Sequence, residues 1–93
     1  MLGLETRLSK NEKIPWRLIE GQAILLDGEE GELIRLNEVG SEIWKAMDGR
    51  RTIGDITQHI AASFDVSERQ AQKDVRRFVR LLLRQELVAQ TIG

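Results

Sequence analysis

A run of basic residues provides the densest set of chemically active side chains. It contains Arg69, Lys73, Arg76, Arg77, Arg80 and Arg84. Spacings of three and four residues place several of these cations on one side of a helix, where they can bind phosphates or carboxylates. An acidic segment, Asp27-Gly-Glu-Glu-Gly-Glu32, carries the opposite charge. Ion recognition is therefore the first chemistry that the sequence suggests.

Catalytic and metal chemistry find little support in the residue types. The chain has no cysteine, which excludes disulfides, thiolate ligands and a cysteine nucleophile. His59 is the only histidine and has no clustered carboxylate partner, so we expect a surface residue rather than a ligand or a base. The sequence shows no pair of carboxylates in an apolar segment, where their pKa values would be shifted toward those needed for general acid–base catalysis. The sequence thus predicts no enzyme, no metal and no cofactor.

Length and composition limit the class of protein. A chain of 93 residues forms one domain with a modest core, and 41% hydrophobic with 31% charged residues is typical of a soluble globular protein. No apolar run approaches the roughly 18 residues that a membrane span needs. The first residues lack the apolar segment of a secretory signal. We therefore expect a cytoplasmic protein with no membrane partner.

Short apolar runs early in the chain predict a sheet. Residues 16–21, 23–27 and 32–37 are each too short for a helix and are separated by turn residues, including Asp27-Gly28 and Gly31. They predict a three-stranded antiparallel meander. Residues 1–15 mix charges with scattered leucines and predict a loosely ordered tail, which leaves 16–93 as the folded domain.

Three amphipathic helices are expected to cover one face of this sheet. Asn37 is a good N-cap for the first, with Gly49 at its C-cap; Thr52 with Asp55 begins the second; Ser67 begins the third, which runs to about Glu86. Apolar residues recur at spacings of three and four, namely Val39, Ile43, Trp44, Met47, Ile53, Ile56, Ile60, Phe64, Ala71, Val75, Phe78 and Leu82. Strands followed by helices predict an α+β, winged-helix-like fold.

A winged helix-turn-helix protein that binds DNA is one reading of this order. The third helix would enter the major groove and its cations would contact phosphates. Three acidic residues share that helix, however, and the acidic hairpin would repel DNA. The total charge is close to neutral, but residues 1–50 carry 7 basic and 10 acidic residues (net −3) and residues 51–93 carry 7 and 5 (net +2), so the basic excess lies in the C-terminal half. DNA binding remains the alternative function. A further possibility is that the cations of the third helix form a solvated surface with no ligand.

A resemblance to a known family favours a different ligand. The segments LNEVGSEIW, MDGRRTIGDI, DVRRFVRLLL and a closing LV together resemble the pyrroloquinoline quinone biosynthesis protein D (PqqD) family, the prototype of the peptide-recognition element of ribosomally made, modified peptides. The most specific parts are Leu36-Asn37 with Gly40, Ile43-Trp44 and Asp48-Gly49. Where the family often has glycine before the final leucine, this chain has Glu86.

The resemblance implies a non-enzymatic domain that binds the leader segment of a precursor peptide. The leader would add as a strand to the third β-strand, lie against the third helix, and be presented to a modifying enzyme. That enzyme would be a radical S-adenosylmethionine protein, a peptidase or a cyclase. The matching site residues are Glu32, Leu33, Ile34, Arg35, Leu36, Arg76, Val79, Arg80 and Leu83.

Physical reasoning agrees with such a site. An exposed edge strand presents unpaired N–H and C=O groups that template another chain. On the third helix, positions 76, 79, 80 and 83 share one side, where an apolar strip edged with cations would suit a leader with an apolar anchor and acidic neighbours. Alternatively, Val79 and Leu83 belong to the core. The same open edge leaves two oligomeric states, a monomer or an edge-paired homodimer.

Overall fold

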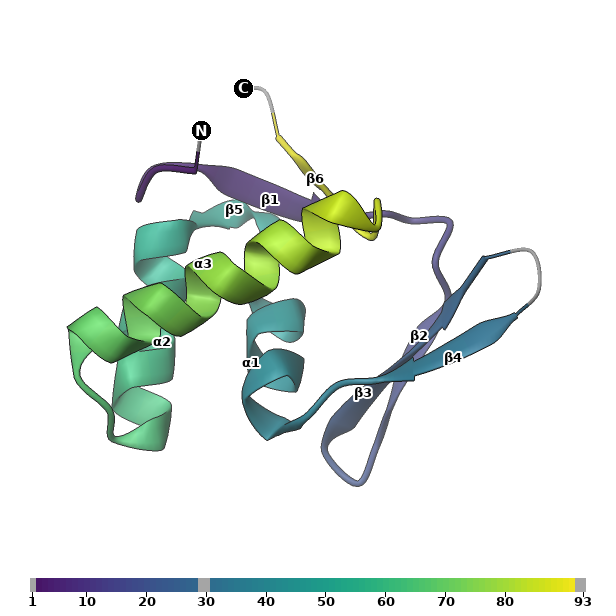
Figure 1. Ribbon diagram of the computed structural model, residues 1–93, viewed down its shortest axis with the longest axis horizontal. Coiled ribbons are helices and arrows are strands. Elements are labelled where there is room, and N and C mark those ends of the chain that lie inside the picture. Colours follow the sequence, from purple (N-terminus) through teal and green to yellow (C-terminus); the bar gives the residue numbers. More distant parts are fainter. Residues whose placement is uncertain (1, 29–30, 92–93) are drawn as a thin grey trace.

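The computed structural model describes residues 2–28 and 31–91, which form three helices and two three-stranded antiparallel sheets (Figure 1). One sheet contains β2 (Trp16–Ile19), β3 (Gln22–Asp27) and β4 (Glu32–Arg35), in that spatial order. The helices are α1 (Glu38–Ala46), α2 (Ile53–Phe64) and α3 (Glu68–Arg84). The predicted α+β fold, with a strand meander followed by three helices, is confirmed.

Turns with positive φ hold the meander together. Glu20 (φ 53°) and Gly21 (φ 84°) join β2 to β3, a pair of values that matches the right-handed twist of a two-residue hairpin. Gly28 (φ 78°) and Gly31 (φ 70°) flank the turn between β3 and β4. The tip of the predicted acidic hairpin, Glu29 and Glu30, lies outside the described residues.

The two faces of this sheet differ in burial. Trp16, Leu25 and Ile34 lie opposite one another in the three strands, and Leu25 is fully buried. On the other face, Leu26 lies opposite Leu33, which is 69% exposed. Because side chains alternate across a strand, one face packs on the core and the other meets solvent.

Side chains cap the start of every helix, as the sequence predicts. The Asn37 side chain accepts the Gly40 N–H at 2.7 Å, Thr52 and Asp55 form a reciprocal capping box, and Ser67 caps α3. The end of α1 was predicted less well. This helix stops at Ala46 with Met47 as its C-cap, and Gly49 instead lies in a strand with φ 81°.

A second sheet corrects the expectation of a loose N-terminal tail. It contains β5 (Asp48–Thr52), β1 (Arg7–Lys10) and β6 (Val88–Gln90), with β1 in the middle. Leu8 on β1 is 1% exposed and belongs to the core. Strands of three to five residues are too short to show a periodic pattern, and the partners of β1 lie far along the chain.

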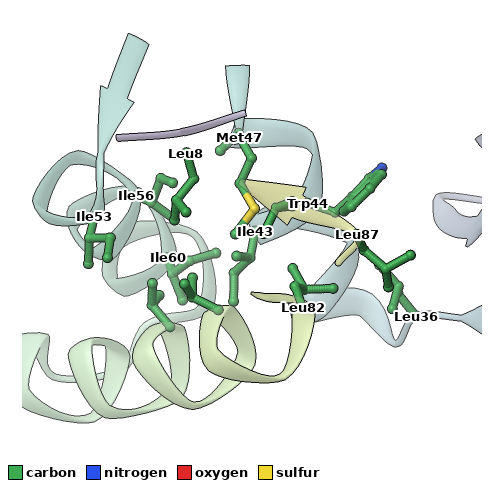
Figure 2. Packing of buried hydrophobic residues seen from close by; sticks show 14 of the residues in the cluster. Leu8, Leu36, Ile43, Trp44, Met47, Ile53, Ile56, Ile60, Leu82 and Leu87 are labelled. Atoms are coloured by element: carbon green, nitrogen blue, oxygen red, sulfur yellow. The ribbon is translucent and has the colours of Figure 1, made fainter. Parts of the chain in front are cut away.

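The core fills the space between the helices and both sheets (Figure 2). Trp44 is 0% exposed, as predicted for a core residue, and its ring forms a T-shaped pair with that of Trp16, with ring centroids 5.9 Å apart. The Lys10 ammonium lies 5.7 Å from the Trp44 ring and donates to the carbonyl oxygens of Lys45 and Met47. Burial lowers the pKa of Lys10, partly offset by the nearby Asp48. The N-terminal strand is thereby tied to the end of α1.

A Schellman motif ends α3. Beyond Arg84, the N–H of Glu86 donates to the Leu83 oxygen at 3.1 Å and the N–H of Leu87 donates to the Leu82 oxygen at 2.9 Å. Glu86 adopts the left-handed conformation with φ 59°, which this motif usually gives to glycine. The chain therefore forms the turn despite the absence of glycine.

Candidate functional site

The free edge of β4 presents backbone groups to solvent. The N–H of Leu36 donates to the Ala23 oxygen on β3 at 2.9 Å. Backbone groups alternate in direction along a strand, so the N–H and C=O groups of Leu33 and Arg35 point away from β3. In the described part of the chain β4 has β3 as its only strand neighbour. These four groups can accept an added strand.

A groove of about 750 Å³ begins where β4 ends and runs between α1 and α3. It is lined by Asn37, Val39, Gly40, Ile43, Lys73, Asp74, Arg77, Phe78, Arg80, Leu81 and Arg84. Gly40 permits the close approach of the two helices, because a Cβ atom there would lie 3.2 Å from Phe78 Cζ. The floor is apolar, and Leu81 at its side is 47% exposed.

The rim of the groove is strongly basic. Lys73, Arg77, Arg80 and Arg84 are exposed and lie along one side of α3. Among residues 2–28 and 31–91, no ion pair involves any of these four cations. The one acidic group in the lining, Asp74, accepts a hydrogen bond from the Gln70 side chain at 2.9 Å. The groove can therefore attract a negatively charged ligand.

Ser41 joins the two halves of this site. Its hydroxyl accepts the Ala23 N–H from β3 at 2.8 Å and donates to the Leu36 oxygen at 3.3 Å. Ser41 lies on α1 and is fully buried. These contacts hold the sheet against α1 and so fix the position of the free β4 edge relative to the groove.

The structure brings together only part of the predicted site. Glu32, Leu33, Ile34 and Arg35 form β4, and Arg80 lines the groove. Leu36, however, is 6% exposed and belongs to the core.

The choice of helix face requires correction. Val79 is 0% exposed and packs in the core, the alternative that the sequence left open. Arg76 and Leu83 are half-buried and do not line the groove. The buried stripe of α3 has two flanks, and helical spacing alone does not say which flank faces α1.

Sequence reasoning missed the flank that does face the groove, with Lys73, Arg77, Phe78, Leu81 and Arg84. A signal for it was present. Phe78 and Leu81 stand three residues apart, directly beside the cations at 77, 80 and 84. Leu81 is an apolar residue outside the predicted core stripe and lies on its basic side.

Other sites that the sequence raised have simple structural roles. His59 is exposed, and its Nε2 atom lies 3.2 Å from a Glu42 carboxylate oxygen. The hydrogen bond from Lys45, with a further one from His59, lowers the pKa of Glu42. The described residues contain no cluster of three or more metal-binding side chains. No helix among them is long and apolar enough to span a membrane.

This geometry defines a class of protein: α+β domains of winged-helix type that have an open strand edge beside a basic groove. Residues 22–88 match the family described as coenzyme PQQ synthesis protein D (PqqD), and the chain belongs to that family. The match contains β3, β4, all three helices and the groove.

Two solved structures share the fold. One is described as TbiB1 in complex with the TbiA(beta) leader peptide; it is 26% identical, has a TM-score of 0.77, and the alignment covers 86% of this chain and 93% of that one. The other is lasso peptide synthetase B1 complexed with the leader peptide, with 24% identity, a TM-score of 0.75, and coverage of 91% and 98%. A comparison with curated proteins finds no significant match.

Proposed function

We propose that this protein binds the leader segment of a ribosomally made precursor peptide by adding it as a strand to β4. The observation that carries the proposal is the pair of outward-facing residues Leu33 and Arg35 beside the groove. Similar folds described as leader-peptide complexes support it. Strand addition supplies main-chain affinity, and the groove supplies side-chain selectivity.

The domain acts as a non-catalytic carrier in the cytoplasm, and a partner enzyme modifies the peptide. That partner is a radical S-adenosylmethionine protein, a peptidase or a cyclase. Ordering a disordered leader costs about 2 to 5 kcal/mol. Holding leader and enzyme together raises the effective concentration of the peptide at the active site and offsets this cost. Since β4 has one free edge, a leader bound there competes with pairing to a second copy, which favours a monomer in the complex.

The DNA-binding alternative gains nothing from the arrangement of the cations. Four of them lie beside Val39 and Phe78 at an apolar groove. A peptide side chain can fill such an apolar groove, whereas a phosphate backbone offers it no apolar group.

Proline substitutions test the strand-addition step. Leu33→Pro and Arg35→Pro each remove an outward N–H while leaving the ladder to β3 intact, a placement that an edge strand tolerates. We expect each to weaken binding of a fluorescein-labelled leader by up to about tenfold, because the loss of one hydrogen bond costs about 0.5 to 1.5 kcal/mol. Once a short precursor reading frame is identified beside the gene, its leader segment serves as the probe, and binding is measured by fluorescence anisotropy.

Leu18→Pro is the matched control. The Leu26 N–H donates to the Pro15 oxygen, so by alternation the N–H of Leu18 points to the open edge of β2, on the far side of the same sheet. This variant should bind like the wild type. Circular dichroism must first show that all three variants are folded. Unchanged affinity in both folded β4 variants would exclude strand addition at this edge.

A further inference from the structure

We infer that the groove selects a peptide segment in which an aliphatic or aromatic side chain is flanked by acidic residues. The inference rests on the proposed peptide-binding function and names the chemistry of its ligand. It comes from two parallel stripes on α3, one apolar and one basic, that both border the groove.

The apolar stripe provides a place for one anchoring side chain. Phe78 is half-buried against Gly40, and Leu81 follows one turn later with 47% of its surface exposed. Val39 from α1 completes this apolar region. An apolar side chain that enters here removes the exposed surface of Leu81 from water, and this burial favours binding.

The basic stripe runs beside the apolar one. Lys73, Arg77, Arg80 and Arg84 follow at intervals of four, three and four residues. At about 1.5 Å per residue, such intervals place successive cations about 4.5 to 6 Å apart along the helix axis. In an extended peptide, side chains on the same side repeat about every 6.6 Å. Acidic residues two positions before and after the anchor lie about 13 Å apart, which is closer to the roughly 10.5 Å between alternate cations, Lys73 with Arg80 or Arg77 with Arg84, than to the distance between adjacent ones.

The charge balance leaves these cations available. The ion pairs found in the described part of the chain use Lys45, Arg51 and His59, and none uses the four cations of the groove. Asp74 is the only acidic group in the lining, and Gln70 already donates to it. A peptide carboxylate therefore meets unpaired guanidinium groups, which bind carboxylates strongly.

A phage-displayed library of random dodecapeptides provides the test, selected against the full-length protein at physiological salt. We expect the selected peptides to be enriched in Asp and Glu at the second position on either side of an aliphatic or aromatic residue. The Arg77→Glu/Arg80→Glu variant, selected in parallel, should instead enrich Lys and Arg there. Anisotropy with one labelled wild-type-selected peptide should show about tenfold or greater loss of affinity in this variant.

Arg17→Glu/Arg69→Glu is the matched control. It makes the same change in net charge with two exposed arginines outside the groove, and should alter affinity by about twofold or less. Selected peptides without acidic enrichment, or an equal loss in both double variants, would overturn the inference and leave peptide binding standing. A library that yields no binding peptide contradicts peptide binding itself, and the inference with it.

Discussion

A single buried hydroxyl positions the candidate site. Ser41 on α1 contacts β3 through the Ala23 N–H and the end of β4 through the Leu36 oxygen. Both contacts are buried, so neither backbone group has water as a substitute. At the scale of one residue, the position of the β4 edge relative to the groove therefore depends on the Ser41 hydroxyl oxygen. This atom makes no direct contact with a peptide added to β4.

Removal of this hydroxyl should destabilise the domain. Ser41→Ala leaves the Ala23 N–H buried without its acceptor, and we expect the free energy of unfolding to fall by about 1 to 3 kcal/mol. Urea denaturation followed by circular dichroism measures this change. Ser63→Ala, an exposed position on α2, is the control and should alter stability by about 0.5 kcal/mol or less. If the two variants are equally stable, the Ser41 hydrogen bonds contribute nothing.

The sequence predicts some elements well, and the reasons are local. The caps at Asn37, Thr52 and Ser67 and the apolar periodicity define the helices, because capping and periodicity depend on neighbours within one turn. The second sheet escaped prediction because β1 pairs with strands more than 35 residues away in sequence.

The site was predicted unevenly for the same reason. The edge of β4 follows from the order of the strands, and the structure agrees with it. Which flank of α3 meets α1 depends on how the helices pack, so helical spacing selected Arg76 and Val79 when the groove is lined by Arg77 and Phe78. Helical periodicity identifies the buried face of α3, but the element that packs against each flank of that face depends on tertiary structure.

The end of α3 offers a stabilising substitution at the scale of one element. Glu86 holds a left-handed conformation that costs a residue with a Cβ atom about 1 to 2 kcal/mol, whereas glycine adopts it freely. Glycine also gains more freedom in the unfolded chain, which reduces the benefit. We expect Glu86→Gly to raise the free energy of unfolding by about 0.5 to 1 kcal/mol, measured by thermal denaturation.

Glu68→Gly, at the start of the same helix, serves as the comparison and should be destabilising. Glycine is a poor helix former, and this change also removes an acidic side chain from the first turn. A lower thermal midpoint for Glu86→Gly would mean that the Glu86 side chain stabilises the domain in a way that its backbone conformation does not reveal.

Across the whole molecule, lowered carboxyl pKa values link stability to pH. The pKa of Asp48 is lowered mainly by a hydrogen bond from the backbone N–H of Arg51 and next by one from Arg50. The pKa of Asp55 is lowered mainly by a hydrogen bond from the backbone N–H of Thr52. Both folded pKa values lie below the ordinary value of 3.8. Their stabilising contribution is therefore complete above that value and is lost as the pH falls through the folded pKa.

Thermal unfolding at a series of pH values tests this linkage. We expect a nearly constant midpoint between about pH 5 and 7 and a decline below about pH 4. Asp48→Asn/Asp55→Asn keeps an acceptor oxygen at each position but removes the titration, so its midpoint should decline less in acid. A parallel decline in the wild type and the double variant would assign the acid sensitivity to other groups.

The pairing of β1 with β6 has a consequence for engineering. Leu8 lies opposite Gln90, so the two ends of the folded chain leave the same sheet side by side, whereas β4 belongs to the other sheet (Figure 1). Domains with adjacent termini tolerate insertion into a surface loop of a host protein. This one can be spliced into such a loop through two short linkers, and the host then gains a domain whose β4 edge stays free of both junctions.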